Sequence, residues 1–288
     1  KTVIKQVCKR LNIDTKMYKE RTLLSEISSA KDELVDVREF EVKSVGDYRK
    51  SVTAKVYREY QDTLKKSNAL DFDDLLVKTV QLFETQPDVL ENYQERFRYI
   101  MVDEYQDTNT VQFQLVSLLA GKYRNLCVVG DDDQSIYKFR GANIKNILNF
   151  EQEFPDATVI KLEQNYRSTQ TIVCAANSLI EKNERQIRKE VFSEKERGEP
   201  IGVFQAYSDV EEGDIVANKI AELRREHSYG YADFAILYRT NAQSRVFEEA
   251  LRKRSMPYKI YGGLSFYQRK EIKDVIAYFR LVVNPNDE

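Results

Sequence analysis

The sequence predicts an α/β protein in which parallel sheets are joined to a separate helical subdomain. From Phe97 onward, short apolar runs that fit strands alternate with longer amphipathic segments that fit helices. Strands separated by helices of this length are usually linked by right-handed crossovers into a parallel sheet. Before Phe97 the chain is polar and helix-patterned, with hardly any strand-like run. These two sequence patterns predict a helical subdomain followed by α/β layers.

The helical part is clearest in the string LDFDDLLVKTVQLFE, residues 70–84. Its apolar residues, among them Leu76 and Val80, recur at helical spacing. Asp73 and Asp74 precede them and suit the first turn of a helix. We therefore expect an amphipathic helix here.

The alternation that follows has two parts, separated by a charged stretch that we expect to be a solvated connection, residues 182–200. Before this stretch, we expect strands at 98–104, 125–131 and 157–165, and helices at 111–121 and 168–183. After it, we expect strands at 201–207, 233–240 and 258–263, and helices at 213–227, 244–254 and 270–285. We place the start of the second α/β layer near Glu163.

The composition fits a folded, charge-mixed protein. Of 288 residues, 42% are hydrophobic and 32% are charged, and the formal net charge is −2. A basic groove can exist within a neutral total, so this charge does not exclude nucleic acid as a partner. No apolar run is long enough to span a membrane, and the first residues lack a signal-peptide pattern. We expect a cytoplasmic protein without a membrane partner.

Cysteine and histidine are too sparse for several classes of site. Cys8, Cys127 and Cys174 are scattered singly among apolar residues, which predicts buried free thiols rather than disulfides or a metal site. The single histidine, His227, lies in a polar stretch. We expect it to be structural or solvated, which argues against His-dependent nucleophilic chemistry.

Polar and charged side chains follow three of the predicted strands. Asp103 and Glu104 follow the first strand, aspartates 131–133 the second, and residues 164–168 the third. Because the carboxyl ends of parallel strands meet at one edge of a sheet, these groups are expected to share a crevice. Carboxylates suit a hard cation such as Mg²⁺, and phosphoryl transfer also needs a positive group such as Arg167. The pattern predicts a site for a metal-bound phosphate.

In such a site, Asp103 would hold the cation, directly or through water, while Glu104 would orient and deprotonate the attacking water. Arg167 would supply positive charge, and Gln134 would sense the terminal phosphate.

A simpler alternative is that the acids after the first strand only form a helix amino terminus. Asp107 or Thr108 would then cap the helix at 111–121, and the helix dipole would favour the other acids. The acidic pair alone does not decide between these interpretations.

Three longer strings resemble the motifs of a known family. They are VDEYQDTN at 102–109, GDDDQSIYKFRGA at 130–142 and LEQNYRST at 162–169. In order and spacing they resemble the Walker B motif, motif III and motif IV of the UvrD/PcrA/Rep family of superfamily 1 DNA helicases. The resemblance extends over essentially the whole chain. It implies a P-loop NTPase (RecA-like) fold, with parallel sheets forming part of domains 1A and 2A and an all-helical 1B subdomain.

This resemblance also implies domain boundaries and an activity. The corresponding parts are 1B at 1–75, the C-terminal part of 1A at 76–162, the N-terminal part of 2A at 163–268 and the start of 2B at 269–288. The implied activity is ATP-dependent 3′–5′ DNA unwinding, with ATP and Mg²⁺ as cofactors. Its implied partners are single-stranded DNA, 3′-tailed duplex DNA and accessory repair or replication proteins.

The family's nucleotide-site residues map onto five positions. Asp103 resembles the Mg²⁺ ligand and Glu104 the catalytic base. Gln134 resembles the γ-phosphate sensor, Tyr166 the adenine-stacking residue and Arg167 an arginine finger.

The family's DNA-contacting residues map onto five more positions. Tyr137 and Phe139, followed by Arg140, resemble the aromatic platform of motif III, and stacking on such a platform tolerates any base. Asn241 resembles a strand-contacting residue of 2A, and Phe72 a base-facing residue of 1B. A core position on a helix face is an equally simple interpretation of Phe72.

The sequence also departs from the family pattern. Members usually have Trp at the position of Phe139 and Arg at that of Lys138, so we expect an altered DNA grip with the same function class.

The sequence has no GxxxxGK[ST] phosphate loop, no amino-terminal adenine-binding Gln motif and no motifs V and VI. We therefore expect an internal fragment that is inactive alone. Two alternatives are a degenerate, non-catalytic helicase-like module that binds DNA or a partner, and an AddA-type helicase-nuclease relative.

Overall fold

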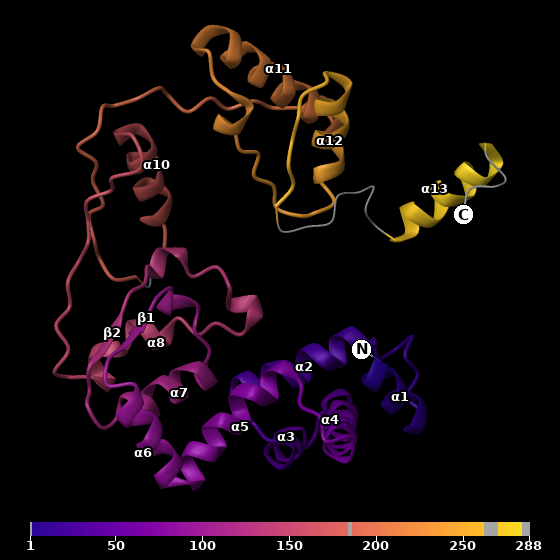
Figure 1. Cartoon of the computed structure of the whole chain (residues 1–288), viewed down its shortest axis with the longest axis vertical. Coiled ribbons are helices and arrows are strands. Elements are labelled where there is room, and N and C mark those ends of the chain that lie inside the picture. The colour runs from indigo at the N-terminus through magenta and orange to yellow at the C-terminus, as the bar shows by residue number, and fades with distance from the viewer. Residues whose placement is uncertain (1, 184–185, 262–269, 284–288) are drawn as a thin grey trace. The chain divides into compact units, whose positions relative to one another are not determined.

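The chain folds into two units, divided between Glu199 and Pro200. The structure is a computed structural model, and it describes residues 2–183, 186–261 and 270–283. The first unit combines a helical bundle with a small parallel sheet, and the second is mostly helical (Figure 1). Within the described ranges, no helix is long and apolar enough to cross a membrane.

The first unit begins with a helical bundle (Figure 1). Its helices are α1 (Thr2–Arg10), α2 (Glu20–Asp32), α3 (Val37–Lys43) and α4 (Tyr48–Lys66). Asp36 and Asp47 cap α3 and α4, because their carboxylates accept hydrogen bonds from backbone N–H groups in the first turn of each helix. The apolar faces of the helices share one core, which includes Ile4, Val7, Leu23, Ile27, Val56 and Tyr57.

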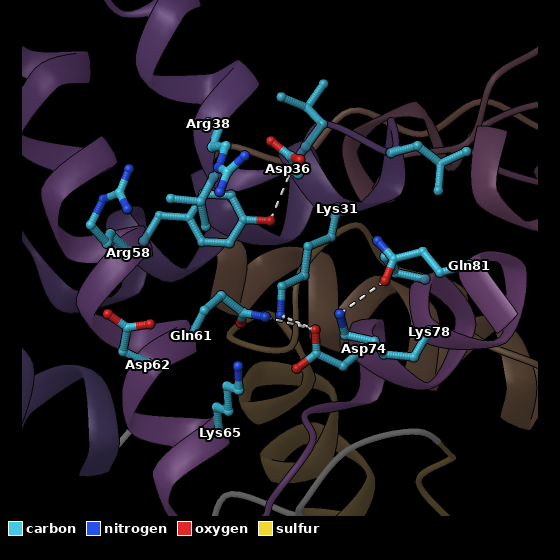
Figure 2. Close-up of a pocket in the computed structure, with 15 residues that line it drawn as sticks. Lys31, Asp36, Arg38, Arg58, Gln61, Asp62, Lys65, Asp74, Lys78 and Gln81 are labelled. Carbon is cyan, nitrogen blue, oxygen red and sulfur yellow. Dashed lines mark hydrogen bonds and ion pairs between the residues drawn. The ribbon is translucent and has the colours of Figure 1, made fainter. Parts of the chain in front are cut away.

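A buried ion pair joins this bundle to α5 (Phe72–Thr85). Asp71 and Asp74 form a capping box at the start of α5. Lys31, only 2% exposed, reaches Asp71 at 2.7 Å and Asp74 at 2.9 Å. Figure 2 shows the ends of Lys31 and Gln61 meeting at Asp74, in a pocket of about 410 Å³. Because these charged groups are buried and paired, they fix the first turn of α5 on the bundle.

The α/β part of the first unit is built on β1 (Ile100–Val102) and β2 (Leu126–Val128). The two strands are parallel, with Met101 opposite Cys127. The chain passes from β1 to β2 through α7 (Thr110–Ala120), so this is a strand–helix–strand crossover of the kind that the sequence predicts (Figure 1).

The cap of α7 is Asn109, rather than the predicted Asp107 or Thr108. The Asn109 side chain accepts a hydrogen bond from the backbone N–H of Gln112, and the Gln112 side chain accepts one from the backbone N–H of Asn109. Asp107 lies two residues earlier, at the end of the 3-10 helix η1 (Tyr105–Asp107), which separates β1 from α7. The remaining helical elements of this unit are α6 (Pro87–Arg96), η1 (Tyr105–Asp107), η2 (Asp132–Gln134), η3 (Lys138–Arg140), α8 (Lys145–Leu148), α9 (Phe150–Glu153) and α10 (Gln170–Ile180).

The second unit is centred on two helices that pack together. Its elements are α11 (Asp209–His227), η4 (Tyr231–Asp233), α12 (Ser244–Lys253) and α13 (Lys270–Val283). Ala217 and Ile220 of α11 meet Ala250 and Leu251 of α12 in a small core. A Cβ atom at Gly213 would lie 2.8 Å from Val246 Cγ1, so the two helices approach closely at that point.

Several predicted strands are not formed. In the described residues, the strands are β1 and β2, with one isolated parallel bridge between Gln164 and Phe192. Residues 201–207 and 233–240 are irregular apart from η4, and Val203 and Leu237 are exposed. An apolar run becomes a strand only beside a partner that pairs its backbone groups, and the described residues supply none for these runs. Of the run predicted at 258–263, the last two residues lie outside the described part.

All three cysteines are free thiols, as predicted, but only Cys8 is buried, whereas Cys127 and Cys174 are exposed. Met101 and Cys127, both exposed, point to the same uncovered face of the short sheet. A strand residue is buried only if a second layer covers its face of the sheet. The sequence of one strand does not show whether such a layer is present.

Candidate functional site

The acidic pair lies where β1 ends. Asp103 and Glu104 are both exposed, and Asp103 Oδ1 accepts a hydrogen bond of 2.9 Å from the backbone N–H of Glu104. Glu104 itself is left-handed, with φ 50° and ψ 41°. This conformation costs a non-glycine residue about 1 kcal/mol or more. It turns the chain sharply out of the sheet and leaves two adjacent carboxylates at the strand end, a donor set that fits a hard cation such as Mg²⁺.

Gln106 ties the ends of the two strands together. Its side chain is buried, donates a 2.8 Å hydrogen bond to Glu104 Oε2 and accepts a 3.0 Å one from the backbone N–H of Asp131. Gly130 makes room for it, since a Cβ there would lie 2.7 Å from Gln106 Oε1. Gln106 is not among the site residues predicted from the sequence. The sequence offers one sign of its role: Gln106 is a polar residue two positions after the acidic pair, in a segment that leads into a buried helix cap.

A third acid lies close to Glu104. Burial and the negative charge of Glu104 raise the pKa of Asp107, and its Oδ1 atom is buried without a hydrogen-bond partner among the described residues. The strand end therefore carries more negative charge than its own groups neutralise, which favours a cation there.

The aspartates after β2 surround a lysine. Lys189 Nζ contacts carboxylate oxygens of Asp131, Asp132 and Asp133, with distances of 2.9 Å to each of the last two. The three carboxylates are close enough together to hold a metal ion, with ligand oxygens within 4.8 Å of one another. In this structure the Lys189 ammonium group occupies the place between the carboxylates that a metal ion would take. From the sequence, these acids are expected beside a metal-bound phosphate and the stretch containing Lys189 is expected to be solvated, whereas Lys189 is only 17% exposed.

The pKa values follow this geometry. Burial alone would raise the pKa of Asp131, but hydrogen bonds from Lys189 and Gln134 outweigh burial and lower it. Burial alone would lower the pKa of Lys189, but the three aspartates outweigh burial and raise it. Both groups therefore stay charged at neutral pH. Gln134, the predicted phosphate sensor, donates a 2.8 Å hydrogen bond from Nε2 to Asp131 Oδ2.

The third predicted segment forms a tight turn held by Asn165. Its Oδ1 atom accepts hydrogen bonds from the backbone N–H groups of Arg167 at 3.0 Å and Ser168 at 2.8 Å. Tyr166 and Arg167 are exposed, and the Tyr166 hydroxyl donates to Gln164 Oε1 at 2.8 Å. In the described part of the chain, no hydrogen bond or ion pair directly connects this turn to the ends of β1 and β2.

The aromatic residues after Gln134 lie close to each other. The ring centroids of Tyr137 and Phe139 are 6.0 Å apart with an interplanar angle of 38°, and Phe139 is 71% exposed. The backbone of Arg140 lies in η3, but its side chain lies outside the described part of the structure. The turn that follows is closed by Gly141, whose φ of 89° favours glycine. Asp32 of the helical bundle lies against this glycine.

Two predicted DNA contacts lie elsewhere. Phe72 is the first residue of α5 and is 89% exposed, so the core-position alternative is wrong for this residue. Asn241 is exposed in the second unit, just before α12, and its carbonyl accepts a 2.9 Å hydrogen bond from Ser244 Oγ. The first unit thus holds nine of the ten predicted site residues, and Asn241 belongs to the second.

Comparison with known proteins agrees with these features. A family model described as the UvrD/REP helicase N-terminal domain matches residues 1–155, and one described as the UvrD-like helicase C-terminal domain matches residues 160–288. The chain is 51% identical over 287 residues to the ATP-dependent DNA helicase PcrA of Bacillus subtilis (strain 168). It is 50% identical over 288 residues to PcrA of Staphylococcus aureus (strain Mu50 / ATCC 700699) and 47% identical over 287 residues to PcrA of Leuconostoc citreum. The matches cover 100% of this chain but only 38–39% of these relatives' length.

Proposed function

The chain belongs to the UvrD-like helicase family, and on that premise we propose that it is the central part of an ATP-dependent DNA helicase. The whole protein would hydrolyse ATP with Mg²⁺, move 3′ to 5′ along single-stranded DNA and unwind 3′-tailed duplex. The observation that carries this proposal is the link between the two strand ends. Gln106 connects Glu104, the candidate base, to the backbone of Asp131, whose side chain holds the candidate phosphate sensor Gln134.

In the proposed ATPase site, each residue at the strand ends has a separate task. Asp103 would hold Mg²⁺, which when bound neutralises charge on the phosphate oxygens. Glu104 would accept the proton of the attacking water. The left-handed turn and the hydrogen bond from Gln106 orient the Glu104 carboxylate before substrate binds, which lowers the entropic part of the barrier. Gln134 would contact the terminal phosphate.

The Asn165 turn would supply the remaining nucleotide contacts. Arg167 would place positive charge on the transferring phosphoryl group, and Tyr166 would stack on the adenine ring. Support comes from the two backbone hydrogen bonds to Asn165, which hold the turn while both side chains stay exposed.

The proposed DNA contacts are aromatic and cationic. Tyr137 and Phe139 would stack on bases without regard to sequence, with Arg140 beside them. Phe72 and Asn241 would contact the strand at separate positions. Phe139 offers a smaller stacking face than the usual Trp, so the grip on DNA would be weaker than in relatives that carry Trp.

We also propose that the family's domain scheme applies to this chain and that the chain alone is inactive. The proposed parts are 1B at 1–75, 1A at 76–162, 2A at 163–268 and 2B from 269 to 288. The proposed setting is the cytoplasm, with repair or replication proteins as accessory partners.

The test uses the protein completed at both ends from its gene. Glu104→Gln should reduce DNA-stimulated ATP hydrolysis by about 10² or more, since a lost general base typically costs that much, while affinity for single-stranded DNA stays unchanged. Glu151→Gln, an exposed acid in α9, is the matched control and should change neither quantity. Normal ATPase in the Glu104→Gln protein would refute the role of Glu104. DNA binding without ATPase in the unmodified protein would favour a non-catalytic helicase-like module.

A further inference from the structure

Residues 187–195 form a strap that contacts both halves of the proposed ATP site. On one side, the backbone N–H of Ile187 donates a 2.7 Å hydrogen bond to Asp132 Oδ2, and Lys189 sits among the three aspartates. On the other side, the strap runs beside the segment that leads into the Asn165 turn, with the backbone N–H of Asn165 donating to the Phe192 carbonyl at 2.7 Å. A segment expected to be a solvated connection is therefore built into the site.

The strap also holds the backbone carbonyls of the proposed arginine finger, Arg167, and of the residue that follows it. Lys195 Nζ donates a 2.9 Å hydrogen bond to the carbonyl of Arg167, and Ser193 Oγ donates a 2.7 Å one to the carbonyl of Ser168. Neither contact uses the Arg167 guanidinium, which stays exposed. The strap thus fixes where the turn lies without occupying the groups that would meet a nucleotide.

At the other end of the strap, Lys189 makes the aspartate cluster stable. Three carboxylates lie within 4.8 Å of one another, and Asp132 is almost fully buried. Like charges this close and this poorly solvated repel strongly, so the cluster needs a cation at its centre. Lys189 supplies that cation from the chain itself, with one ammonium group shared by three acceptors.

The contact with Asp131 reaches the proposed phosphate sensor. One oxygen of Asp131 contacts Lys189, and the other accepts the hydrogen bond from Gln134 Nε2. A carboxylate held at one oxygen presents its other oxygen in a fixed direction. We propose that Lys189 is a positioning residue that orients Gln134 through Asp131 and links it, through the strap, to the backbone of Arg167. This inference rests on the proposed function, because Gln134 and Arg167 matter to it only as nucleotide contacts.

The experiment compares Lys189→Met, Lys189→Arg and the control Lys182→Met in the protein completed at both ends. Lys182 is an exposed lysine that precedes the strap. We expect Lys189→Met to lower kcat for DNA-stimulated ATP hydrolysis by about tenfold or more, the size of a lost charge-assisted hydrogen bond, with a smaller change in KM for ATP. Lys189→Arg keeps the positive charge but replaces the compact ammonium group with a planar guanidinium group. Its kcat should therefore lie between those of the unmodified protein and Lys189→Met. Lys182→Met should match the unmodified protein.

The deciding measurement repeats these substitutions in a Gln134→Ala background. If Lys189 acts through Gln134, Lys189→Met should cause little further loss of kcat there, whereas a purely structural role would cause the same loss in both backgrounds. Equal losses, or an unchanged kcat in the Lys189→Met protein, would overturn the proposal. If circular dichroism shows that Lys189→Met does not fold, the same comparison with Lys189→Arg decides. Loss of ATPase in Glu104→Gln, measured in parallel, shows whether the proposed function holds independently of Lys189.

Discussion

Replacing Asp32 by Asn should stabilise the protein at neutral pH and have little effect in acid. Asp32 is the last residue of α2, where its Oδ1 atom accepts a 2.7 Å hydrogen bond from Asn109 Nδ2. Burial, with a smaller contribution from the negative charge of Asp73, raises the pKa of Asp32 from 3.8 to about 6, although the Asn109 hydrogen bond opposes the change. The folded protein therefore carries a carboxylate in a place that disfavours its charge.

The sign of the effect follows from proton binding. Between about pH 4 and pH 6 the folded state holds the Asp32 proton more tightly than the unfolded state, so stability falls as the pH rises through this window. The full penalty is present above pH 6. The pKa of Asp32 differs by about two between the folded and unfolded states, which corresponds to about 3 kcal/mol of lost stability. Solvent screening of this half-buried side chain reduces that loss to about 1–2 kcal/mol. Asn keeps an oxygen for Asn109 and removes the charge.

The assay is urea unfolding at several pH values, comparing Asp32→Asn with the unmodified protein and with Asp62→Asn. Asp62 is an exposed acid of α4, and its substitution should change the free energy of unfolding by less than about 0.5 kcal/mol at every pH. We expect Asp32→Asn to raise the free energy of unfolding by about 1–2 kcal/mol at about pH 7.5 and to leave it almost unchanged at about pH 4. A gain that does not vary with pH, or a loss at about pH 7.5, would refute the reasoning.

Two further substitutions test the packing described above. Lys31→Met should lower the free energy of unfolding by about 3–5 kcal/mol, because it leaves the buried Asp74 and the partly buried Asp71 without a cation; a loss under about 1 kcal/mol in urea unfolding would contradict this. Gly130→Ala should cost about 1–3 kcal/mol, since its Cβ would lie 2.7 Å from Gln106 Oε1 and 2.9 Å from Ile147 Cδ1. It should also lower ATP hydrolysis in the completed protein by displacing the residue that holds Glu104. An unchanged melting temperature together with unchanged ATPase would show that the site accommodates the methyl group.

The sequence was sufficient to predict features that depend on local pattern. The strands at β1 and β2, the helix between them and the acids at their ends follow from apolar periodicity and from where that periodicity stops. Phe72 was left open between an exposed and a core position, because helical spacing alone does not give the orientation of a helix's first residue.

Features that depend on distant parts of the chain could not be predicted in this way. Lys189 lies in a charged stretch whose composition is typical of a solvated segment, and its burial depends on three aspartates more than fifty residues earlier. The expected strands at 201–207 and 233–240 have the right composition, but a strand forms only with a partner. Pairing of this kind is a property of the whole sheet.

The buried ion pair beneath α5 has a consequence for binding at Phe72. A ring on a flexible loop must lose backbone freedom when a ligand stacks on it, at a cost of about 1–2 kcal/mol for each residue that becomes ordered. Phe72 follows Asp71 directly, and the capping box and Lys31 already hold that turn of the backbone. A base that stacks on this ring would therefore meet a surface that is rigid before contact, and most of the stacking energy would remain available for holding the strand.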